Sequence, residues 1–172
     1  LTVAAHAHGT AGINLALSAG VNSIEHGSYN DSHGHALFKK TGAFLVPTAS
    51  VVQINVKSDL RNAESPMREV MQNFVEQHPK RMLDAYRAGV KIAAGSDAGV
   101  TKHGENAKEL QFYVEAGMPA KNALIAATIH GAELLGQEKN LGTLDKSKVA
   151  DIIAVKSNPL DDIKILQRVD FV

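Results

Sequence analysis

Two histidines, His6 and His8, stand one residue apart at the end of a short apolar run in the segment LTVAAHAHGTAG. Side chains at positions i and i+2 of a strand point to the same side, so both imidazoles share one face. His26 follows a second apolar run in NSIEHG, and Asp97 follows a later one in AAGSDAG. Imidazole and carboxylate groups are ligands that divalent ions such as zinc take from proteins. This pattern therefore predicts a metal site.

The chemistry of such a site would be hydrolysis. A metal held by few protein ligands keeps a position for water, lowers the pKa of that water and polarises a substrate carbonyl. Asp97 is the candidate to accept the proton from the water and pass it to the leaving group. The alternative is structural, because a histidine at a strand end is often only hydrogen-bonded and an aspartate before Ala-Gly is common in turns. The pattern alone leaves both interpretations open.

The elements that would position these residues alternate along the chain as parallel βα units do. In a parallel barrel the carboxyl ends of all strands gather at one rim, where the active site forms. Three of the four main strand candidates end in His or Asp beside a glycine-containing turn. We expect strands at 1–7, 21–27, 43–48 and 90–99, with a later one at 149–155. We expect helices at 10–18, 32–42, within 58–88, at 106–116 and at 119–135.

The composition limits the classes of protein and of partner. The 172 residues are 44% hydrophobic, and Lys plus Arg balance Asp plus Glu at 18 each. This neutral charge gives no electrostatic argument for nucleic acid or an anionic membrane surface, and no apolar stretch reaches the roughly 20 residues of a membrane span. The absence of cysteine excludes disulfides and thiolate metal sites. It leaves the compartment open between cytoplasm and periplasm.

Four blocks, in order, resemble the C-terminal half of the amidohydrolase superfamily: VAAHAHG with GVNSIEHGSY, AGVKIAAGSDAG, GENAKELQFYVEAGMPAKNALIAATIHGAELLG, and GTLDKSKVADIIAVKSNPLDDI. The branch resembled is that of imidazolonepropionase-like hydrolases, which includes Xaa-Pro dipeptidases. This resemblance implies an α/β fold, a partial (β/α)8 TIM barrel with strands five to eight in residues 1–140. It also implies that residues 141–172 supply C-terminal strands of a small β-sandwich domain.

The same resemblance implies roles for individual residues. His6 and His26 correspond to the metal ligands of strands five and six. Asp97 corresponds to the strand-eight carboxylate, which contacts metal and carries the proton. Tyr29 is placed to bind a substrate carboxylate, the alternative being a surface tyrosine in a turn. His8 faces substrate, supports the ligands or makes a hydrogen bond in the barrel mouth.

His103, in the loop after strand eight, either meets substrate or caps the following helix, and we favour the cap. The chain lacks the strand-one His pair and the strand-four residue of the family, and Ser147 replaces a glycine usual before the late strand. Since residue 1 already lies in a strand-like run, we expect the chain to be a piece of a longer protein.

The implied activity is cleavage of a C–N amide or peptide bond in a dipeptide or N-acyl amino acid, dependent on a divalent metal for which zinc is the favoured candidate. The alternatives are hydrolysis of a cyclic amide, as in imidazolone ring opening, and a non-catalytic half-barrel. Four strands of a barrel leave unpaired edges, so we expect homo-oligomerisation or association with an N-terminal half, and little activity in isolation.

Overall fold

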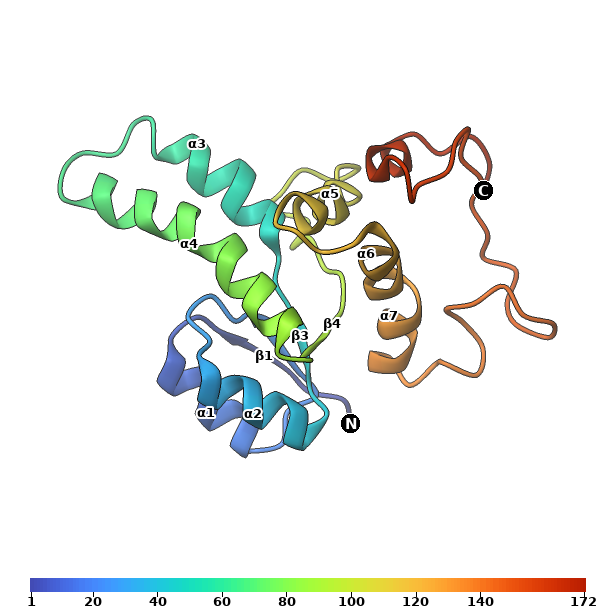
Figure 1. The fold of residues 1–172 in the computed structure, drawn as a ribbon, viewed down its shortest axis with the longest axis horizontal. Coiled ribbons are helices and arrows are strands. Elements are labelled where there is room, and N and C mark those ends of the chain that lie inside the picture. The colour runs from blue at the N-terminus through green and yellow to red at the C-terminus, as the bar shows by residue number, and fades with distance from the viewer.

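A four-stranded parallel sheet lies at the centre of the computed structural model, which describes residues 1–172 (Figure 1). Its strands are neighbours in chain order, and each is joined to the next by helical segments. They are β1 (Ala4–Ala7), β2 (Ser23–His26), β3 (Phe44–Val46) and β4 (Lys91–Ile92). This arrangement confirms the predicted α/β class with a parallel sheet.

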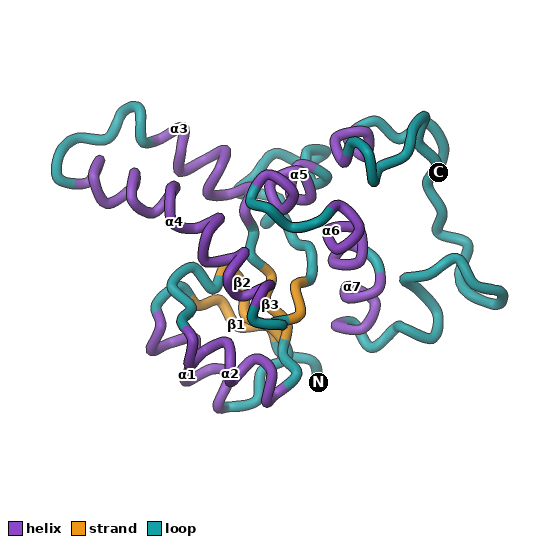
Figure 2. The backbone as a smooth tube through the Cα atoms, viewed as in Figure 1, coloured by secondary structure: helices purple, strands orange, loops and turns teal.

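Helices make up most of the remaining regular structure (Figure 2). The π-helix η1 (Val51–Val56) and helix α4 (Met67–Arg87) form the long excursion between β3 and β4, and α4 ends one residue before the end of the predicted helical region at 58–88. The α-helices are α1 (Thr10–Ser18), α2 (Ser32–Thr41), α3 (Lys57–Asp59), α4 (Met67–Arg87), α5 (Lys108–Glu115), α6 (Ala120–Ala127) and α7 (Ile129–Leu134). The others are η1 (Val51–Val56) and the 3-10 helix η2 (Ile163–Gln167).

The main hydrophobic core lies between the helices and one face of the sheet. Ile24 of β2, Leu45 of β3 and Ile92 of β4 are all at most 2% exposed. Their register partners place them side by side, since Ile24 pairs with Leu45 and Leu45 with Ile92. Ile13 and Leu17 of α1 cover this face and are fully buried. This core fixes the four strands as one rigid platform.

Helix α2 shows how local sequence sets an element's ends. The Asp31 carboxylate accepts a hydrogen bond from the Gly34 amide at 2.7 Å, which caps the helix N-terminus. Gly42 ends the helix in the left-handed conformation, with φ +74°. These two signals position the segment that leads into β3.

Three predicted elements differ from the structure. The expected strand at 90–99 is reduced to Lys91–Ile92, because the Ala94 amide bonds the Ala126 carbonyl of α6 and the chain leaves the sheet. The expected helix at 119–135 is two helices, separated at Thr128, whose φ of −123° and ψ of −81° are not helical. Besides these differing elements, the π-helix η1 has no counterpart among the predicted elements.

The third predicted element that differs from the structure is the strand expected at 149–155, in the C-terminal segment. The predicted strand at 149–155 pairs with no strand and makes only a single bridge, antiparallel, between Ala154 and Phe171. Ile152 and Ile153 are 43% and 53% exposed. An extended segment needs a neighbouring strand to satisfy its backbone groups, and the four-stranded sheet lies elsewhere (Figure 1). No helix of the chain combines the length and the apolar character needed to cross a membrane.

Candidate metal centre

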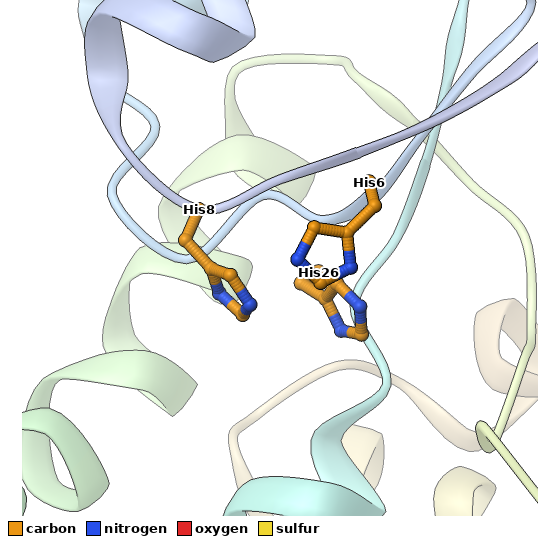
Figure 3. A group of neighbouring side chains, drawn as sticks. All are labelled: His6, His8 and His26. Carbon is orange, nitrogen blue, oxygen red and sulfur yellow. The ribbon is translucent and has the colours of Figure 1, made fainter.

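Three imidazoles meet at the carboxyl end of the sheet (Figure 3). His6 lies in β1, His8 directly follows it, and His26 is the last residue of β2. Their candidate ligand nitrogens all lie within 4.8 Å of one another. The ring centroids are separated by 4.8 Å for His6 and His8, 4.5 Å for His6 and His26, and 4.6 Å for His8 and His26. We call these three residues the histidine cluster.

The His26 ring is held by the end of the neighbouring strand. Its Nδ1 lies 2.7 Å from the Thr48 hydroxyl oxygen, and that hydroxyl also donates to the Pro47 carbonyl at 2.7 Å. A hydroxyl has one proton to donate, so the Thr48 oxygen accepts from His26 Nδ1–H when its own proton goes to Pro47. His26 then carries its free lone pair on Nε2, the atom available to bind a metal.

His8 is held in a similar way by the turn after β2. Its Nδ1 lies 2.8 Å from the Ser28 hydroxyl oxygen, and Ser28 is buried. The backbone joins the same two segments, because the Tyr29 amide donates to the His8 carbonyl at 2.9 Å. This explains how the segment after β1 stays against the segment after β2.

Two members of the histidine cluster, His8 and His26, favour the neutral imidazole. Burial lowers the pKa of His8, and the nearby His6 lowers it further. Burial also lowers the pKa of His26, and His8 and His6 add to this effect while Asp97 opposes it. Neutral imidazole is the form that binds a metal ion. The electrostatics and the donor types therefore fit a divalent ion that prefers nitrogen ligands.

Three residues at the strand ends adopt left-handed backbone conformations that are uncommon for non-glycine residues. They are His26 at φ +71°, Thr48 at φ +50° and Asp97 at φ +52°. For the β-branched Thr48 this conformation is a clear outlier. Such conformations persist only where the surrounding structure enforces them, and they concentrate at functional sites.

Asp97 lies outside the histidine cluster, in the exposed turn after β4. It is near enough to influence two groups of the sheet, since its charge acts to raise the pKa of His26 and of Glu25. Burial is the largest cause of the raised pKa of Glu25, and a hydrogen bond of 2.6 Å from Ser23 opposes it. The metal and proton roles of Asp97 stay predictions.

Apart from His8, the two predicted substrate contacts lie in different surroundings. Tyr29 is 38% exposed, and its ring packs against α4, with the Arg81 guanidinium carbon 4.6 Å from the ring centroid and Phe74 at 5.8 Å. Tyr29 is thus held next to His8 by the backbone bond while its side chain stays partly exposed. His103 is exposed in the loop before α5, and the N-terminus of that helix makes no side-chain capping bond. The expectation that His103 caps α5 is therefore wrong.

Comparison with known proteins places these residues in a family. The Amidohydrolase family model matches residues 1–172. The chain belongs to the amidohydrolase family. It is 41% identical over 170 residues to the ochratoxinase of Aspergillus niger, an alignment that covers 96% of this chain and 34% of that protein.

Solved structures agree with this assignment. An Xaa-Pro dipeptidase with bound methionine in its active site superimposes with a TM-score of 0.91 at 42% identity, covering 99% of this chain and 42% of that one. The A. niger ochratoxinase structure superimposes with a TM-score of 0.87 at 38% identity, covering 97% and 38%. The chain thus spans less than half the length of these relatives, and the predicted resemblance is confirmed.

Sequence reasoning missed the residues that hold the histidines. Thr48 ends the third strand segment in LVPTAS, so the rule that singled out the ends of the other strands could have found it. Ser28 and the buried Glu109 carry no comparable signal, because their contacts join segments 20 and about 60 residues apart.

Proposed function

We propose that this chain provides part of the metal centre of a divalent-metal-dependent amidohydrolase that cleaves a C–N amide or peptide bond. The observation that carries the proposal is the histidine cluster at the carboxyl end of parallel strands. Parallel βα folds place their active sites at this end. Amidohydrolases generally use divalent metals, and three nitrogen donors without any cysteine suit zinc.

His6, His8 and His26 are the residues that would hold the ion. The Thr48 and Ser28 hydroxyls orient two of these rings, which limits the reorganisation needed for binding. A bound divalent ion would activate water and polarise the substrate carbonyl. Asp97 is assigned the proton transfer from water to the leaving amine, and its exposed position leaves it accessible to substrate.

The substrate class we propose is a small amide that carries a carboxylate, such as a dipeptide or an N-acyl amino acid. Beside the histidine cluster, the Tyr29 ring stacks with Arg81, and the Arg81 Nη1 is buried with no hydrogen-bond partner. A phenol and a guanidinium both donate hydrogen bonds that a carboxylate accepts. His103 is exposed in the loop between β4 and α5 and would contact only larger substrates.

We further propose that residues 1–140 form strands five to eight of a (β/α)8 barrel and that residues 141–172 belong to a small β-sandwich domain. Activity then requires the segments that correspond to the remaining 58 to 66% of the relatives' lengths, in the same protein or in an associated chain. The 172 residues alone would hydrolyse amides slowly.

The test is a chimera in which this chain replaces the matching region of the Xaa-Pro dipeptidase relative. We expect the zinc-loaded chimera to hydrolyse Xaa-Pro dipeptides, and Asp97→Asn to lower kcat by about 10² to 10⁴. The matched control is Asp151→Asn, an exposed aspartate in the C-terminal segment, which should leave kcat unchanged. A folded, zinc-loaded chimera that hydrolyses no amide would contradict the proposal.

A further inference from the structure

We propose that Glu109 is a positioning residue of the metal centre, acting through the backbone of Ala49 and Ser50 on Thr48, which orients His26. This inference rests on the proposed function for the role of His26 as a metal ligand. Glu109 itself lies on α5, more than 80 residues beyond His26 in the chain. It touches none of the three histidines of the cluster.

The Glu109 carboxylate is a buried acceptor with three donors aimed at it. Oε1 accepts from the Ala49 amide at 2.6 Å, and Oε2 accepts from the Ser50 amide at 2.7 Å and from the Ser50 hydroxyl at 2.6 Å. The residue is 1% exposed, and no Lys or Arg forms an ion pair with it. A buried carboxylate without a cation is costly unless hydrogen bonds compensate it, so these bonds fix the turn tightly.

The turn that Glu109 holds begins at Thr48. Thr48 is 4% exposed and keeps its left-handed conformation between β3 and the amides that Glu109 binds. Its hydroxyl donates to the Pro47 carbonyl and lies 2.7 Å from His26 Nδ1. If the turn shifts, this oxygen moves away from Nδ1, and His26 loses the partner that keeps its lone pair on Nε2.

Glutamine is the sharpest replacement for Glu109, because it has the same shape and lacks one acceptor. Its NH2 group must face either the Ala49 amide or the Ser50 pair, so at least one donor then meets another donor. The turn must move to relieve this contact. A role limited to joining α5 to the core would alter stability without changing His26.

The experiment measures two properties of the full chain in wild type, Glu109→Gln, Thr48→Val and the double variant. The first is the dissociation constant for Zn²⁺ alone, from competition with a chelating dye. The second is the tautomer of His26 in the metal-free protein, from long-range ¹H–¹⁵N NMR. Leu110→Ala is the matched control, because Leu110 is a neighbouring core residue of α5 at 7% exposure with no link to Thr48.

We expect Glu109→Gln and Thr48→Val each to weaken zinc binding by about 10- to 100-fold. The double variant should bind zinc only as weakly as whichever single variant has the lower zinc affinity. The reason is that both substitutions disturb the same series of contacts from Glu109 to His26. The Nδ1–H tautomer of His26 should dominate in wild type and be lost in both variants. Leu110→Ala should destabilise the fold and leave zinc affinity within about twofold.

Any one of three results would overturn the inference. The first is wild-type zinc affinity in folded Glu109→Gln, and the second is an unchanged His26 tautomer in that variant. The third is single-variant effects on zinc affinity that multiply in the double variant. If Glu109→Gln does not fold, Ser50→Ala removes one of the three donors, and an unchanged tautomer there has the same meaning. A wild-type chain that binds no zinc refutes the proposed function instead. The His26 tautomer in metal-free Glu109→Gln then decides the positioning role by itself.

Discussion

The two faces of the four-stranded sheet use alternate residues of the same strands for different purposes. On the face toward the helices, Ile24 and Leu45 are at most 1% exposed and join the main core. On the opposite face, His6 pairs in register with Glu25, and His6 is exposed. Since strand side chains alternate between faces, one register fixes both sets. The main core therefore lies on one face, while the opposite face carries only the small buried cluster of Phe44, Val46 and Ala93, with the candidate chemistry at its end.

The largest effect should come from the face toward the helices. Ile24→Ala removes a fully buried side chain and leaves a cavity in a core that other strands and helices also share. We expect a loss of about 2 to 5 kcal/mol in the free energy of unfolding, measured by chemical denaturation. Ser23→Ala, the adjacent residue on the opposite face, should cost about 1 kcal/mol through its lost hydrogen bond to Glu25. Equal losses in the two variants would contradict the division between faces.

The next effect concerns His78 of α4, which lies behind the end of β3 and is 2% exposed. Burial lowers its pKa to about 4, His26, His8 and Arg81 act in the same direction, and the Pro47 carbonyl opposes them. In the unfolded chain the His78 imidazole takes up a proton near pH 6.5, whereas in the folded chain it does so only near pH 4. Stability is therefore fully present above pH 6.5 and falls by about 3 kcal/mol as the pH drops to 4.

Denaturation at several pH values tests this expectation. His78→Phe should flatten the dependence of unfolding free energy on pH between 6.5 and 4 relative to wild type. His33→Ala changes an exposed histidine on α2 and should leave the slope as it is. A wild-type slope retained in His78→Phe would show that other groups carry the pH dependence.

Sequence patterns predicted the parallel sheet better than the side-chain contacts at its carboxyl end. Alternating apolar runs located β1 to β3 and brought His6 and His26 to one end, because strand periodicity and chain direction are local properties. The support for these histidines, from Thr48 and Glu109, depends on packing between distant segments. The strand expected at 149–155 failed for the same reason, since a strand needs a partner and local propensity does not supply one.

Gly27 lies where the two faces meet, directly after His26, and replacement by alanine should have an intermediate effect. Its φ is +55°, and an added Cβ would lie 2.3 Å from the Leu45 Cδ1 atom. Gly20 is a matched control, because its φ is +88° and an added Cβ would meet open space. We expect thermal or chemical denaturation to show Gly27→Ala about 1 to 3 kcal/mol less stable than Gly20→Ala. Equal stabilities would mean that Leu45 adjusts without cost.

The smallest effect on stability should come from the histidine cluster itself. His6 is exposed and contributes no packing to the main core. His6→Ala should therefore change the free energy of unfolding of the metal-free chain by no more than about 0.5 kcal/mol. A loss of several kcal/mol would show that this face also supports the fold.

Zinc binding tests the central claim most directly. Elemental analysis and Zn²⁺ titration should give about one ion per wild-type chain and at least about tenfold weaker binding in His6→Ala and in His26→Ala. His8→Ala should also weaken binding, since His8 is the third imidazole of the cluster, and His33→Ala is the control that should match wild type. Zinc bound equally by wild type and by a variant lacking all three clustered histidines, or by neither, would contradict the account.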